Sequence, residues 1–162
     1  MANAVLLERP LALQPAPAQR TGSIEDSLSR ATANLERCAH SYFDEPTRLS
    51  LWAITAAAVE AAQALQSHAR ECESESGVLA GLAASQPGMV ASIERTWTDH
   101  ELAISQANDL VITATSVQAR TSPASTMLYQ RALLCARLIA SHRGRVDGLV
   151  FDWALRDIGG EG

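Results

Sequence analysis

Residues 90–114 read VASIERTWTDHELAISQANDLVITA, with mainly apolar side chains at alternating steps of three and four residues. Because an α-helix turns about once every 3.6 residues, this spacing places one stripe of side chains on a single helix face. The stripe comprises Val90, Ile93, Trp97, His100, Ile104, Ala107, Val111 and Ala114. The segment is therefore predicted to be a long amphipathic helix whose apolar stripe is interrupted by a histidine.

Three further segments show the same spacing. Their stripes are Ile24, Leu28, Ala31, Leu35, Cys38 and Tyr42; Leu51, Ile54, Ala58, Ala61, Leu65, His68 and Cys72; and Leu128, Ala132, Cys135, Ile139, His142, Val146, Leu149 and Trp153. Ser23 opens the first helix in a pattern that resembles a capping box, and this helix ends near Phe43. The second helix follows Pro46 and runs to about residue 72, and the last lies between residues 122 and 160. Four long amphipathic helices with short connections favour an all-α, up-down-up-down antiparallel four-helix bundle over residues 23–160.

The segments outside these helices are short. Residues 1–22 contain prolines and are expected to form a flexible N-terminal arm. The sequence GVLAGLAA, residues 77–84, is expected to form a short helical turn over one end of the bundle.

The stripes of three helices each contain one histidine, namely His68, His100 and His142. In an antiparallel bundle, the height of a residue follows from its distance to the shared turn, at about 1.5 Å per residue. His68 then lies about 33 Å from its turn, and the other two lie about 29 Å from a turn at the same end. The three imidazoles are therefore expected at one level in the core, whereas His40 lies off its stripe and is expected at the surface.

Three neutral imidazoles in an apolar layer need partners, because unmet buried polar groups cost stability. A metal ion would supply them, and carboxylates lie nearby in the sequence. On the first helix, Glu25 is at the right height, although the positive helix end also favours a carboxylate there. Mixed imidazole and carboxylate ligands suit iron, manganese or zinc. The predicted metal ligands are His68, His100, His142, Asp147, Glu73 and Glu25.

Several segments resemble the hemerythrin-like (HHE cation-binding) domain family. In the last helix, His142 and Asp147 form an H-x-x-x-x-D pattern that continues as DGLVFDWALRDIGGE. The stretches HARECESESGVLAGLAASQP, from residue 68, and DHELAI, from residue 99, are similar to the second and third helices of the family. The resemblance covers about residues 23–160 and implies a bundle with a di-iron centre that senses, stores or handles iron, oxygen or nitric oxide.

The ligand pattern is degenerate relative to that family. Its second-helix motif is H-x-x-x-E, but Cys72 stands four residues after His68. Its third-helix motif is H-x-x-x-H, but Ile104 stands four residues after His100. Three histidines in place of five imply mononuclear iron or an altered di-iron site, and they leave manganese or zinc open.

The amino-acid composition argues against nucleic acid and membranes as binding partners. The formal net charge is -5, and every basic residue other than histidine is Arg. No broad positive surface is expected for nucleic acid or for a membrane. No apolar stretch approaches the length of a membrane span, so a cytoplasmic location is expected. Three cysteines without a metal-type or disulfide-type spacing are expected to be reduced core thiols.

Other functions stay open at this point. The bundle could be a metal-free helical interaction module whose histidines are satisfied polar residues of the core. A histidine phosphotransfer bundle is a weaker alternative, based on the short H-E-L sequence at His100. A metal-dependent oxidase or oxygenase and a homodimer are also compatible with the sequence, although binding is favoured over catalysis.

Overall fold

The computed structural model describes the backbone of residues 17–118 and 125–159, and the side chains of residues 26–117 and 126–155. Within these ranges the chain is helical and contains no β-strand. The prediction of an all-α protein is therefore confirmed. None of the described helices combines the length and the apolar character that a membrane span requires.

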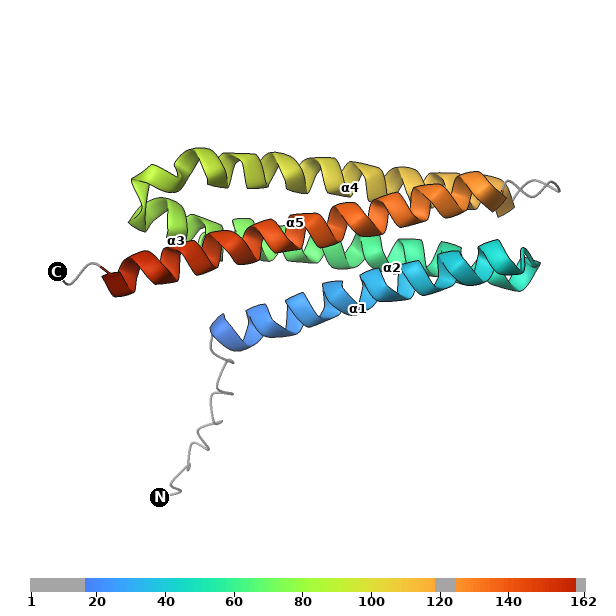
Figure 1. The fold of residues 1–162 in the computed structure, drawn as a ribbon, viewed down its shortest axis with the longest axis horizontal. Coiled ribbons are helices and arrows are strands. Elements are labelled where there is room, and N and C mark those ends of the chain that lie inside the picture. The colour runs from blue at the N-terminus through green and yellow to red at the C-terminus, as the bar shows by residue number, and fades with distance from the viewer. Residues whose placement is uncertain (1–16, 119–124, 160–162) are drawn as a thin grey trace, which may run out of the picture.

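Four long helices make up most of the described chain: α1 Pro17–Asp44, α2 Arg48–Glu73, α4 Val90–Gln118 and α5 Ser125–Gly159. They lie side by side along the long axis of the molecule (Figure 1). Helix α2 packs against α1 and α4, and α5 packs against the same two helices from the other side. The four helices therefore enclose one common interior.

Helix α1 begins at Pro17, whereas the sequence predicted a start at Ser23. Proline is well tolerated in a first helical turn, because the N–H that it lacks has no partner there. The predicted flexible arm of residues 1–22 is thus helical from Pro17, and residues 1–16 lie outside the described residues. Two other predicted end signals, at residues 122–123 and at Gly160, also lie outside them.

The break between α1 and α2 lies where the sequence places it, and Thr47 caps α2. The Thr47 hydroxyl accepts a hydrogen bond from the Ser50 N–H at 3.1 Å. In return, the Ser50 hydroxyl accepts one from the Thr47 N–H at 2.9 Å. This reciprocal pair satisfies two N–H groups that have no partner within the helix, so α2 can start within a few residues of the end of α1.

Two short helices follow α2: α3 Val78–Ser85 and the 3-10 helix η1 Pro87–Met89. The predicted helical turn at residues 77–84 is therefore confirmed as α3. A Cβ atom at Gly77 would overlap the backbone oxygens of Glu71 and Cys72. Glycine thus lets α3 start directly against the end of α2.

The predicted stripes of α1, α2 and α5 are largely buried where their side chains are described. In α4 only half of the stripe is correct. Residues 93, 100, 107 and 114 are buried as predicted, but Trp97 is 39% exposed and Thr96 beside it is 2% exposed. Helix α4 contacts both α2 and α5, so its buried face is wider than a single stripe and is centred toward residues 96, 103 and 110.

The buried apolar side chains form two clusters. The larger cluster fills most of the length of the four long helices and includes Leu35, Leu65 and Ile139. The smaller cluster joins α3 and η1 to the long helices and includes Cys72, Leu79, Leu82, Met89, Ile93 and Val146.

Truncation of Leu35 tests the larger cluster. Leu35 is fully buried, so Leu35→Ala should lower the free energy of unfolding by about 2–5 kcal/mol through lost burial and the cavity left behind. The matched control is Leu49→Ala, because Leu49 is 81% exposed and its loss should change stability by less than about 0.5 kcal/mol. Urea unfolding followed by circular dichroism measures both. Equal effects of the two substitutions would contradict this packing.

Candidate metal centre

Three buried histidines meet inside the bundle, one from each of three helices. His68 belongs to α2, His100 to α4 and His142 to α5, and each is at most 1% exposed. The ring centroids of His100 and His142 are 4.2 Å apart, and each lies 5.4 Å from that of His68. The structure thus brings together the three histidines that the spacing predicts at one level, and we call them the histidine layer.

The histidine layer lies between the two apolar clusters. Along α2, His68 stands between Leu65 of the larger cluster and Cys72 of the smaller one. Along α5, His142 stands in the same way between Ile139 and Val146. The layer is therefore a polar plane across an otherwise apolar core, where an unmet polar group costs stability.

Glu73 contacts the histidine layer from the last residue of α2. Its carboxylate oxygen Oε1 lies 2.6 Å from His100 Nδ1. A carboxylate can only accept, so the Nδ1–H of His100 is the donor, and Nε2 of a neutral ring then carries a lone pair. His100 Nε2 is buried and has no hydrogen-bond partner among the described residues.

The other two rings approach each other closely. His142 Nε2 lies 3.4 Å from His68 Nε2, and His142 Nδ1 is buried without a hydrogen-bond partner in the described part of the chain. Two nitrogens from this layer thus lack a partner, one on α4 and one on α5.

Burial determines the protonation of these rings. It lowers the pKa of His142 to about 3, helped by the neighbouring charges of His100, His68 and Arg145. Burial also lowers the pKa of His100, although the hydrogen bond and the charge of Glu73 oppose that shift. His100 and His142 are therefore neutral near pH 7, which is the form in which histidine binds metals.

Cys72 joins the layer, although the sequence analysis did not include it among the candidate ligands. Its Sγ lies 3.7 Å from His68 Nε2 and 3.9 Å from His68 Nδ1. Side-chain donor atoms of His68, Cys72 and His100 all lie within 4.8 Å of one another. The available signal was the spacing, since residues 68 and 72 are one helical turn apart on the same face.

The remaining predicted site residues lie elsewhere or are not described. The structure does not bring Asp147 into the layer, because its side chain is 62% exposed and pairs with Arg143 at 3.8 Å. Glu25 lies in α1, but its side chain is outside the described residues. His40 is exposed, as predicted, and contacts the Tyr129 hydroxyl at 3.3 Å.

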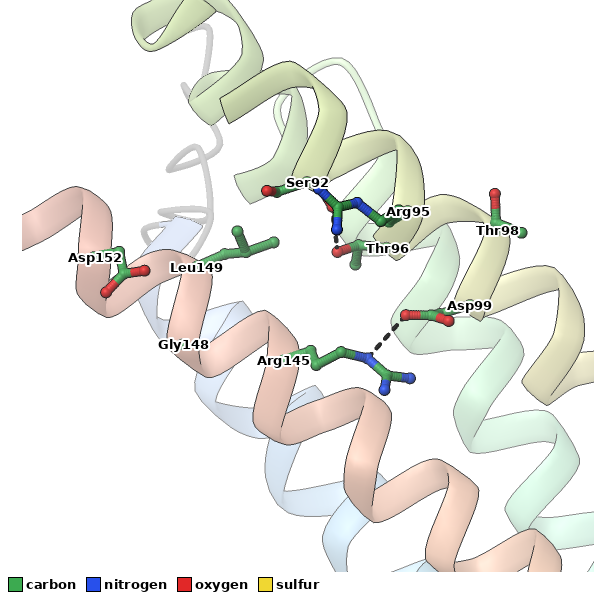
Figure 2. A pocket seen from close by; sticks show the side chains of 9 residues that line it. All are labelled: Ser92, Arg95, Thr96, Thr98, Asp99, Arg145, Gly148, Leu149 and Asp152. Atoms are coloured by element: carbon green, nitrogen blue, oxygen red, sulfur yellow. Dashed lines mark hydrogen bonds and ion pairs between the residues drawn. The ribbon is translucent and has the colours of Figure 1, made fainter. Parts of the chain in front are cut away.

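A groove of about 590 Å³ lies between α4 and α5, and none of the three histidines lines it. Thr96 and Asp99 line it within one turn of His100, and Arg145 lines it within one turn of His142. Figure 2 shows Asp99 and Arg145 reaching toward each other from the two helices, and their charged atoms are 2.8 Å apart. The groove is thus an open surface one helical turn along the chain from His100 and His142, and one ion pair crosses it.

The low pKa of His142 makes the stability of the metal-free protein depend on pH. The unfolded chain takes up a proton near pH 6.5, whereas folded His142 does so only near pH 3, so the unfolded state binds more protons between these values. Its contribution to stability is full above about pH 6.5 and is lost as the pH falls toward 3. His142→Gln should flatten this decline by up to about 1.4 kcal/mol per pH unit in urea titrations.

The control is His40→Gln, which replaces an exposed histidine and should keep the wild-type pH dependence. An unchanged pH profile in His142→Gln would show that His142 does not remain neutral in the folded protein.

Comparison of the chain with protein-family models, with curated proteins and with solved structures finds no match.

Proposed function

We propose that this protein is a hemerythrin-like metal-binding bundle that holds a transition metal ion, with iron as the first candidate, at His68, His100 and His142. The single observation that carries the proposal is the state of His100. Glu73 fixes the Nδ1–H of this ring at 2.6 Å, and the opposite nitrogen is buried in the layer without a hydrogen-bond partner among the described residues.

The hydrogen bond from His100 to Glu73 supports a ligand role for His100. Metal-binding histidines almost always donate the second ring N–H to a carboxylate, a carbonyl or water, which orients the ring and raises its basicity. Glu73 was predicted as a direct ligand. In the proposal it is instead the hydrogen-bond acceptor that positions His100.

The energetics of burial also favour an ion. A buried nitrogen without a partner costs about 1–3 kcal/mol, and the layer contains one on His100 and one on His142. A bound ion would convert the Nε2 lone pair of His100 into a coordination bond, whereas His142 faces His68 through Nε2 and not through the unpartnered Nδ1. Bound iron with a free coordination position would supply a binding place for oxygen or nitric oxide, and the groove at Asp99 and Arg145 offers a side of approach.

The proposal includes an up-down-up-down antiparallel order of the helices. The α1–α2 connection lies at one end of the molecule in Figure 1 and α3 lies at the other, as this order requires. Short connections such as the one capped by Thr47 also favour antiparallel neighbours. Asp147 has no part in the proposed ligand set, because it pairs with Arg143 on the exposed face of α5.

Metal analysis of the purified protein tests the function. The wild type, produced in medium replete with iron and zinc, should retain about one equivalent of a transition metal that a strong chelator removes. His68→Ala should retain less than about a tenth of that amount, because one ring of the layer is lost. His40→Ala is the matched control and should bind as the wild type does, since His40 is exposed on α1.

Less than about a tenth of an equivalent in the wild type would overturn the proposal and favour the metal-free interaction module. Circular dichroism of each variant establishes that any loss of metal is not a loss of fold.

Glu73→Gln tests the positioning role of the carboxylate. The change keeps the size of the side chain but removes its charge, and it should weaken metal binding by about 10–100-fold. Glu75→Gln, two residues further along on an exposed side chain, should leave the affinity unchanged. Competition with a chromophoric chelator measures both affinities. Equal affinities for the two variants would remove Glu73 from the site.

A further inference from the structure

We infer that the Cys72 thiolate is a ligand of the same ion, together with His68 and His100, so that the site selects a borderline divalent metal such as zinc or ferrous iron. The inference rests on the proposed metal-binding function and specifies the chemistry of that site. Its basis is the position of Cys72, which is 2% exposed and faces the histidine layer from α2.

Cys72 and His68 are arranged as a chelating pair. They are four residues apart in α2, so their side chains lie one above the other on one helix face. The same spacing allows two histidines of one helix to bind a single zinc ion in the H-E-x-x-H motif. Helix α2 therefore presents a thiol and an imidazole in a spacing that can bind one ion.

The donor atoms of Cys72, His68 and His100 all lie within 4.8 Å of one another, which brings them close enough to share one ion. With metal–sulfur and metal–nitrogen bonds of about 2.3 and 2.05 Å, sulfur and nitrogen ligands of one ion are about 3.6 Å apart, and two nitrogens about 3.3 Å. The observed distances from His68 Nε2 are 3.7 Å to Cys72 Sγ and 3.4 Å to His142 Nε2. Because Cys72 Sγ also lies 3.9 Å from His68 Nδ1, the His68 ring would turn on metal binding so that its Nε2 lone pair points at the ion that the thiolate holds.

The charges around the layer also balance. A divalent ion buried among neutral rings would carry an uncompensated charge of +2, which is costly in an apolar core. One thiolate at Cys72 and the carboxylate of Glu73, held 2.6 Å from His100, together supply −2. The assembly of ion, thiolate, carboxylate and imidazoles is then neutral.

The thiolate narrows the choice of metal. Soft thiolate ligands favour zinc and other borderline or soft ions, whereas magnesium, calcium and manganese prefer oxygen ligands. The other two cysteines lie in the larger cluster, away from this pairing. The Cys38 thiol lies 3.6 Å from Asn34 Oδ1, and burial raises the pKa of Cys135 to about 11.

Cobalt titration of the metal-free full-length chain tests the inference. Co²⁺ gives a sulfur-to-metal charge-transfer band in the near ultraviolet only when a thiolate is bound, whereas imidazoles alone do not. The wild type and Cys135→Ser, the control for a buried thiol, should show this band. Cys72→Ser should lose it and should bind Co²⁺ at least about tenfold more weakly, as even outer-shell changes can do.

The outcomes separate the inference from the proposed function. Cobalt binding by the wild type without the band, or a band that persists in Cys72→Ser, would overturn the thiolate ligand and leave the metal site standing. No binding of cobalt, zinc or iron by the wild type would overturn both. If Cys72→Ser does not fold, X-ray absorption of the zinc-loaded wild type decides, since a bound thiolate gives a sulfur shell at about 2.3 Å and its absence overturns the inference.

Discussion

The hydrogen bond between His100 Nδ1 and Glu73 Oε1, at 2.6 Å, is the contact on which the candidate centre depends. It joins the middle of α4 to the last residue of α2 and fixes which nitrogen of His100 carries the proton. The opposite nitrogen is thereby left as a lone pair in the core. Gly77 lets α3 start directly against the end of α2, where Glu73 is the last residue.

The histidine layer divides the core into two apolar clusters and does so at an energetic cost. Among the described residues, His100 Nε2 and His142 Nδ1 have no hydrogen-bond partner, a cost that apolar side chains at these two positions would avoid. This is the expected pattern where local stability and function compete. A bound ion would offset this loss of stability, because it would coordinate a ring nitrogen that the apolar core leaves without a hydrogen bond.

The side chains that the structure brings together differ from the ligands of the family that the sequence resembles. Two of the predicted carboxylate ligands have other partners, since Glu73 accepts a hydrogen bond from His100 and Asp147 pairs with Arg143 on an exposed face. A thiol, that of Cys72, lies 3.7 Å from His68 Nε2. The groove at Asp99 and Arg145 opens between α4 and α5, one helical turn along the chain from His100 and His142. The combination suits a site that binds a borderline ion in a largely dry interior.

Helix periodicity is a local property, so the sequence alone determined the all-α class, the buried stripes of α1, α2 and α5, and the three histidines that meet. The sequence could not show which side of α4 is buried, because apolar or neutral residues occur there in adjacent pairs such as Thr96 and Trp97. Only the packing of α4 against both α2 and α5 determines which residue of such a pair is buried. The hydrogen-bond partners of the histidines also depend on the tertiary structure. Glu73 and His100 are 27 residues apart in the chain and meet only when α2 and α4 pack together.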